Sequence, residues 1–239
     1  MTDPANLATR ELDGLDPYER QDRESDRISS FLGGLDDDGW SAPTGCAEWT
    51  RRDLVAHLAA TEGYHRAGLD DTLGALFERL LAAGAHDLHS FNDVGVRERS
   101  DRSAGEVLEE WRASNRATRA GFRDRGDGSM ATSVGPYPAR WQAFHVASEL
   151  ATHADDLGVP VTDDERDDRT AWRVRVSRFA LGEAKGDLSV ERSDGGTRVV
   201  GQGIDVEVPD EDLVVAVSGR LPADSQLDPA TRAVLSTMP

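Results

Sequence analysis

The feature that most constrains the fold is apolar spacing of three and four residues, which recurs in several separate segments. After Thr50, the residues Leu54, His57, Leu58 and Thr61 follow the spacing i, i+3, i+4, i+7. This spacing puts them on one face of a helix, so His57 is expected to face inward with the leucines. We predict four main helices and a shorter helical piece, which makes a helical bundle. The main helices are expected at 17–32, after Thr50 through at least Thr61, at 103–115 and at 138–157, with the short piece at 71–83.

Residues suited to helix ends support these segments. Thr50 followed by Asp53, and Ser103 followed by Glu106, form patterns typical of a capping box. Pro138 stands at a plausible first helical position, and Gly158 ends the segment that it opens. The intervening stretches lack periodicity and are predicted to be loops: 33–48, 86–101 and 121–138.

The last third of the chain has a different pattern. An acidic stretch at 159–168 is interpreted as a linker, and a helix is expected from Trp172 to Ala180. Two short strands should flank the Asp-Gly turn at 194–195. Ile204–Val208 and Leu213–Val217 are predicted to be further strands, and Asp228 to open a short terminal helix. We therefore predict an α+β chain: a helical bundle at 1–160, with a loose lead-in over 1–16, and a small α+β domain at 165–239.

Composition excludes several function classes. Cys46 is the only cysteine, so no intrachain disulfide can form and a metal would have to use histidine and carboxylate. The formal charge of −18 disfavours binding to nucleic acid. No apolar run approaches the ~18 residues of a membrane span, and the start has no signal-peptide pattern. A cytoplasmic location without nucleic-acid or membrane partners is expected.

One pair of residues indicates metal binding. Glu149 and His153 are spaced i, i+4 and lie about 40° apart around a helix. A third ligand from another helix would leave a coordination position open, as catalytic zinc requires, and His57 is a candidate. The spacing also allows an ordinary helical pair and a hydrogen-bonded core histidine. His145 shares the stripe and is a rival ligand, although three ligands on one helix converge poorly.

Two motifs resemble the mycothiol-dependent maleylpyruvate isomerase family of actinobacteria, whose amino-terminal domain is a DinB-like four-helix bundle. WTRRDLVAHL is similar to the family's W-T-x-x-D-L-x-x-H-L, and ELATHADDL is similar to its E-x-x-x-H-x-x-D-L. The resemblance implies that His57, Glu149 and His153 bind zinc. It also implies mycothiol as a thiol cofactor and a small-molecule substrate.

A weaker resemblance concerns the carboxyl-terminal domain. DEDLVVAVSGRL is similar to the family's pattern of a strand that ends in Gly-Arg. An arginine of this domain is implicated in the isomerase activity, so the resemblance implies that Arg220 is catalytic. The competing interpretation is a strand-end arginine in a surface ion pair.

These observations leave several functions open. The first is an enzyme that uses mycothiol either for cis–trans isomerisation or for S-transfer to an electrophile. Cys46 is not expected to be the nucleophile, since no base adjoins it in the sequence. The others are a non-catalytic regulatory or carrier module that binds metal, and a zinc hydrolase with Glu62 or Asp156 as base. Asp156 could instead orient a ligand histidine or simply end its helix. Glu62 and His65 either line the pocket or are solvated.

Overall fold

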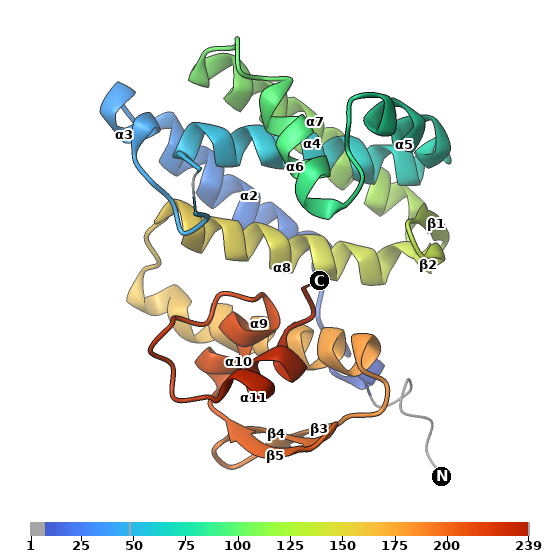
Figure 1. The fold of residues 1–239 in the computed structure, drawn as a ribbon, viewed down its shortest axis with the longest axis vertical. Coiled ribbons are helices and arrows are strands. Elements are labelled where there is room, and N and C mark those ends of the chain that lie inside the picture. Colours follow the sequence, from blue (N-terminus) through green and yellow to red (C-terminus); the bar gives the residue numbers. More distant parts are fainter. Residues whose placement is uncertain (1–7, 48, 239) are drawn as a thin grey trace. The chain divides into compact units, whose positions relative to one another are not determined.

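The computed structural model describes residues 8–47 and 49–238. They fall into two compact units, whose elements are labelled in Figure 1. The first unit spans residues 16–160. The second contains residues 8–15 together with residues 161–238.

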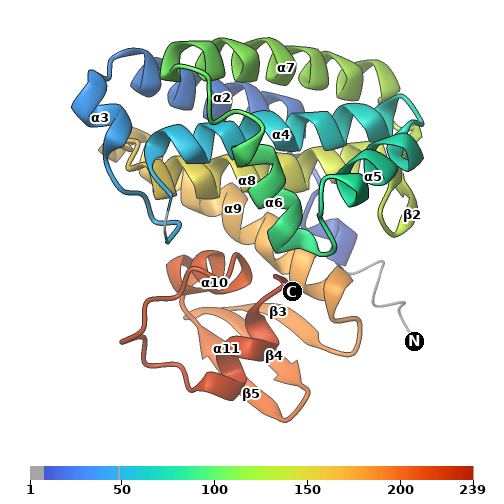
Figure 2. The same cartoon turned by 45° about the horizontal axis from the view of Figure 1, so that its top comes forward.

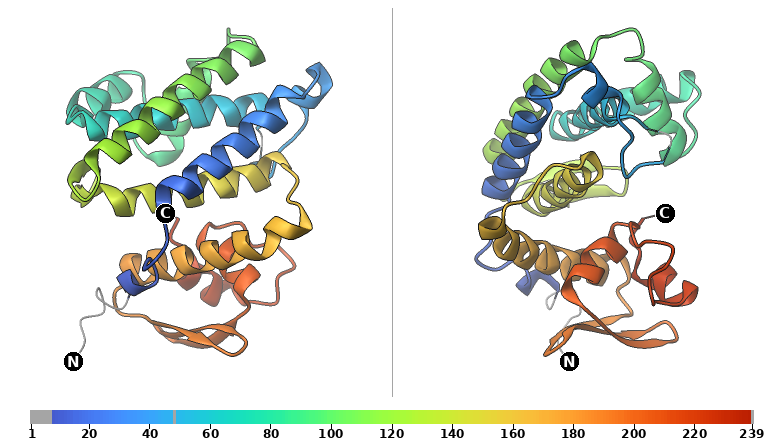
Figure 3. Two further views of the ribbon diagram at one scale, coloured as in Figure 1. Left: turned by 180° about the vertical axis from the view of Figure 1, so that it is seen from behind. Right: turned by 90° about the vertical axis from the view of Figure 1, so that its left-hand side faces the viewer.

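The first unit is built on four long helices, each of 17 residues or more. Figure 2 shows how they lie together. α4 packs on α7, and α2 contacts both α8 and α7 (Figure 3). This confirms the predicted four-helix bundle. The elements of this unit are α2 (Pro17–Gly33), α3 (Asp37–Ser41), α4 (Arg51–Leu69), α5 (Leu73–Ala82), α6 (Leu88–Arg97), α7 (Ala104–Arg125), β1 (Ser129–Thr132), β2 (Gly135–Pro138) and α8 (Ala139–Leu157).

The helix ends follow the capping patterns of the sequence. Thr50 and Asp53 form a complete capping box at the start of α4, and the Thr50 amide donates to Asp53 Oδ2 at 3.1 Å. Ser103 and Glu106 do the same for α7. Gly158 ends α8 with φ = 75°, a conformation that glycine adopts readily. The prediction for Pro138 was off by one position, because its backbone is extended and α8 begins at Ala139.

The core of the bundle lies between the apolar faces of these helices. Leu54, Trp111 and Phe122 are among its fully buried side chains. His57 is only 6% exposed, so the expected inward orientation of the α4 stripe is confirmed. Burying an aromatic or leucine side chain stabilises the fold by about 1.5–3 kcal/mol, so this shared core holds α4 and α8 in place.

Three segments predicted to be loops contain secondary structure. Asp87 and Ser90 form a capping box that starts α6, a helix too short for its periodicity to stand out in the sequence. Asp36 likewise caps the single-turn helix α3. In the Gly/Pro-rich stretch, α7 continues to Arg125, and β1 and β2 then pair as an antiparallel hairpin. The turn of this hairpin is Ser133–Val134, and Gly135, Pro136 and Pro138 of the stretch are residues of β2 itself.

The second unit packs helices with one small antiparallel sheet. Its strands are β3 (Ser189–Ser193), β4 (Gly196–Gly201) and β5 (Ile204–Val208), in the order β3-β4-β5. The predicted strand pair around the Asp-Gly turn is confirmed. The helices are α9 (Asp163–Ala184), α10 (Asp210–Val217) and α11 (Pro229–Leu235), the last capped by Asp228 as predicted.

Two predictions for this unit were wrong. The acidic stretch is no linker beyond Thr162: Glu165 completes a capping box with Thr162, and acidic side chains favour the first turn of α9. Leu213–Val217 is helical, not a strand. Three acidic residues fill the first turn of α10, and its apolar run is buried on one helical face.

The described part of the lead-in belongs to this second unit. Residues 8–15 form backbone turns, and Leu12 and Leu15 are buried. In the same unit, the buried guanidinium of Arg178 in α9 is 5% exposed and donates hydrogen bonds to the side chains of Thr197 and Asp210. Residues 1–7 of the predicted lead-in lie outside the described residues. Within the described residues, every helix falls short of the length or the apolarity that a membrane crossing demands.

Gly95 allows α6 to pack closely on α4. A Cβ added at Gly95 would stand 2.4 Å from Cβ of Ala60, whereas one added at Gly63 in α4 would meet nothing within 4 Å. We expect Gly95→Ala to lower the free energy of unfolding by about 1–3 kcal/mol, because the clash outweighs the gain in helix propensity. Gly63→Ala should raise it by about 0.5–1 kcal/mol. Urea denaturation measures both, and stabilisation by Gly95→Ala would contradict this packing.

Candidate metal centre

The structure brings together the three residues proposed as metal ligands. α4 carries His57, and α8 carries Glu149 and His153. One potential ligand atom of each lies within 4.8 Å of the others. The rings of His57 and His153 meet edge to face with centroids 5.1 Å apart. Helical spacing indicated only Glu149 and His153, and the family motif selected His57.

The cluster is buried on its histidine side and more open at the carboxylate. His57 and His153 are 6% and 7% exposed, whereas the Glu149 side chain is 33% exposed. The Trp49 ring lies 5.1 Å from the His57 ring and covers it. Glu149 is therefore the most exposed of the three side chains.

Asp156 fixes the orientation of His153. Its Oδ2 lies 3.0 Å from His153 Nδ1, and its side chain is 6% exposed. With a proton on Nδ1 shared with this carboxylate, Nε2 is the nitrogen left to bind a metal. Asp156 was expected either to orient a ligand histidine or simply to end its helix. This geometry supports the first interpretation.

Cys46 also lies at this site, which its position in the sequence did not reveal. Its thiol donates to Asp156 Oδ2 at 3.2 Å, across 110 residues of sequence. The Gly45 amide donates to the Asp156 carbonyl at 2.9 Å, and a Cβ on Gly45 would stand 2.6 Å from Asp156 Oδ1. Arg51 Nε donates to the Leu157 carbonyl at 2.9 Å. The segment before α4 is thus attached to the last turn of α8.

Glu62 and His65 are buried, so the solvated interpretation is wrong for both. Each is 3% exposed. His65 Nε2 lies 3.7 Å from Glu149 Oε2, and Glu62 accepts a hydrogen bond from Asn115 at 2.8 Å. Burial, more than any neighbouring charge, raises the pKa of Glu62. These side chains extend the polar cluster from Glu149 into the bundle.

His145 points to a different neighbour. Its Nε2 lies 3.1 Å from the hydroxyl of Tyr137, which belongs to β2. Among the described residues, the ligand group around His57 does not include His145. A packing role on the α8 stripe therefore agrees with this contact.

Opposite charges within the cluster shift two pKa values strongly. Burial opposes ionisation of Glu149, but contact with His65 and the charges of His153 and His57 lower its pKa to about 2. Burial also opposes protonation of His153, yet its bonds to Asp156 and Cys46 and the charge of Glu149 raise its pKa to about 9. The cluster therefore favours a positive charge at its centre, which a proton or a cation can supply.

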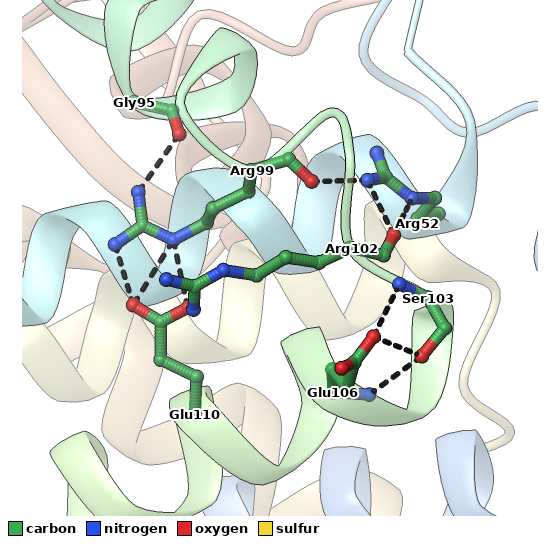
Figure 4. Close-up of polar contacts among 7 residues, drawn as sticks. All are labelled: Arg52, Gly95, Arg99, Arg102, Ser103, Glu106 and Glu110. Carbon is green, nitrogen blue, oxygen red and sulfur yellow. Dashed lines mark hydrogen bonds and ion pairs between the residues drawn. The ribbon is translucent and has the colours of Figure 1, made fainter.

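A second polar network holds the start of α4, a helical turn before His57. Arg52 donates to the carbonyls of Arg99, Ser100 and Arg102, the last at 2.8 Å. Arg99 and Arg102 both pair with Glu110 of α7, Arg99 at 2.7 Å (Figure 4). The network links the segment between α6 and α7 to α4, and so fixes the helix that carries His57.

Arg220 lies in the second unit. It follows Gly219, whose φ is 69°, directly after α10. Its amide donates to the Val215 carbonyl at 2.7 Å, and the residue is half-buried. It was expected at the end of a strand, but the structure places it at the end of a helix.

Comparison with known proteins agrees with this arrangement. The profile of the mycothiol maleylpyruvate isomerase N-terminal domain matches residues 22–158, more than half of the chain. The chain belongs to this family. The match contains the whole ligand cluster of His57, Glu149 and His153.

Solved structures show the same fold. The crystal structure of the mycothiol-dependent maleylpyruvate isomerase is 17% identical, with a TM-score of 0.51, over 77% of this chain and 72% of that chain. A histidine-to-alanine mutant of that isomerase is 16% identical, with a TM-score of 0.59, over 92% of each chain. No curated protein matches the sequence significantly. At this identity, the family fold is shared and the substrate stays open.

The pKa of His153 predicts how pH affects the metal-free protein. Because this pKa is raised from 6.5 to about 9, protonated His153 stabilises the folded protein. This contribution to the free energy of unfolding is complete below pH 6.5 and is lost as pH rises through 9. We expect the melting temperature in chelator to fall between pH 6.5 and 9, and to fall less in His153→Asn. His145→Asn is the matched control and should follow the wild type. If the melting temperature of His153→Asn fell as much as that of the wild type, His153 would not be the group responsible for the pH dependence.

Proposed function

We propose that this chain is a zinc-dependent enzyme that uses mycothiol as its thiol cofactor. It would isomerise a small molecule of the maleylpyruvate type or transfer the thiol to an electrophile. The observation that carries this proposal is the convergence of His57, Glu149 and His153 in a member of this family.

The donor set suits a catalytic zinc ion. Two imidazoles and one carboxylate are ligands found in catalytic zinc sites, where a further position stays open. We expect that position to face the partly exposed side of Glu149. Zinc held there would lower the pKa of a coordinated thiol, so that the thiolate is present at neutral pH.

The residues around the ligands keep this donor set in place. Asp156 holds the proton on His153 Nδ1, which leaves a lone pair on Nε2. His65 lies beside Glu149 and limits the positions of its carboxylate. Trp49 shields one face of His57 from water. A ligand set held by packed neighbours binds metal with little reorganisation.

The chemistry needs neither oxidant nor reductant. In isomerisation, the thiol adds its sulfur and a proton across the cis double bond of the substrate, and the resulting single bond rotates. Elimination of the same thiol then forms the trans double bond. In S-transfer, the substrate keeps the new carbon–sulfur bond. We propose that Arg220 binds a substrate carboxylate, since a guanidinium can hold both carboxylate oxygens.

The hydrolase alternative needs a carboxylate that is available to act as a base. Asp156 Oδ2 contacts both His153 and Cys46, and Glu62 is buried against Asn115. These contacts favour a thiol supplied from outside over a water activated by either carboxylate.

Replacing a ligand tests the metal assignment. We expect His57→Ala to lose the zinc that the purified wild type retains, because two ligands hold the ion too weakly. His145→Ala should retain it, since His145 contacts Tyr137 instead. Elemental analysis after dialysis gives the zinc per chain. Full zinc retention by His57→Ala would overturn the assignment.

The reaction is tested with Arg220 variants of the zinc-loaded protein. Wild type should convert maleylpyruvate to its trans isomer, or form a thioether with an electrophile, only when mycothiol is added. We expect Arg220→Ala to lower kcat/KM by about 10- to 100-fold, the loss of a charged hydrogen bond, with unchanged zinc content. Arg220→Lys should recover part of the lost kcat/KM, because it keeps the positive charge. Turnover without mycothiol, or unchanged kcat/KM in Arg220→Ala, would contradict these roles.

A further inference from the structure

A second group of potential metal ligands shares His153 with the first. It consists of Cys46, His153 and Asp156, whose ligand atoms lie within 4.8 Å of one another. Asp156 Oδ2 is 3.2 Å from Cys46 Sγ and 3.0 Å from His153 Nδ1. The three atoms are thus as close together as ligands of one ion.

The second group offers a different chemistry from the first. It contains a thiol, which as a thiolate prefers soft cations, in place of the second imidazole. Cys46 is half-buried. Its segment is fixed by the Gly45 amide on the Asp156 carbonyl, so the thiol is already placed.

The two groups do not merge into one site. Among the described residues, no group within the same 4.8 Å limit combines Cys46 with His57 or Glu149. The second group uses the face of His153 that carries Nδ1, whereas the first is left with Nε2.

We propose that Cys46, Asp156 and His153 form a separate position for a thiophilic divalent cation such as cadmium. A neutral imidazole has one lone pair. A cation on Nδ1 therefore moves the remaining ring proton to Nε2, while the Cys46 thiol releases its proton to solvent. His153 can then no longer serve the centre with His57 and Glu149. The two positions exclude each other, so a thiophilic cation held by Cys46 displaces an ion from the centre with His57 and Glu149.

Cadmium titration of the metal-free, full-length protein tests the position itself. Cys46 is the only cysteine, so a sulfur-to-cadmium charge-transfer band in the ultraviolet reports on it alone. We expect the band to saturate at one cadmium per chain in the wild type and in His57→Ala. Cys46→Ser keeps a hydrogen-bond donor toward Asp156 and should lose the band.

Three outcomes would overturn the position. Cadmium binding without the band would leave Cys46 out of the site. A band lost in His57→Ala would assign the thiol to the first centre. Saturation at half an equivalent would indicate cadmium shared between two chains. The zinc content of the wild type without cadmium is a separate measurement, so failure of this position and failure of the proposed function are distinguishable.

Competition tests the exclusion. With one equivalent each of zinc and cadmium, the wild type should hold one metal ion per chain in total and lose zinc as the band grows. In Cys46→Ser, the same cadmium should leave more zinc bound. Two ions per chain with the full band would show that both positions fill together, which would overturn the exclusion.

Discussion

The structure of the site depends on placing ionisable side chains inside a helical bundle. An unpaired buried charge costs several kcal/mol, so such groups persist only with partners. Here two of the central groups are paired: Glu149 lies beside His65 and near the charge of His153, and His153 contacts Asp156. The resulting cluster is short of positive charge at its centre. That shortage, more than any single ligand, makes the cluster suitable for a cation.

The sequence predicted the features that are set locally. Each helix end depends on only a few neighbouring residues. The structure confirms the capping boxes at Thr50 and Ser103 and the end of α8 at Gly158. The α4 stripe correctly placed His57 inside. The local pattern did not show whether Leu213–Val217 is a strand or a helix, because a short apolar run fits a buried strand or a helix equally. Three acidic residues before it were the signal for a helix start.

Contacts between distant segments could not be read from spacing. Cys46 meets Asp156 through the tertiary packing of the segment before α4 on the end of α8, and no period in the sequence relates them. His57 required the family motif, because helical geometry alone left His145 as a rival. The burial of Glu62 and His65 likewise depends on α7, through Asn115 and the packing of α4. Sequence therefore indicated the candidate ligands, and the structure supplied their surroundings.

The attachment of α8 at its carboxyl end affects how the site moves. Helix ends usually fray, and His153 and Asp156 lie in the last two turns of α8. The Gly45 amide and the Arg51 guanidinium each bond a terminal carbonyl of that helix. Opening these turns requires breaking contacts made by a remote part of the chain, so fluctuations of this helix end are coupled to the segment ahead of α4. These side chains are therefore held in place by the fold itself, and little of their conformational entropy is left to lose on binding a ligand.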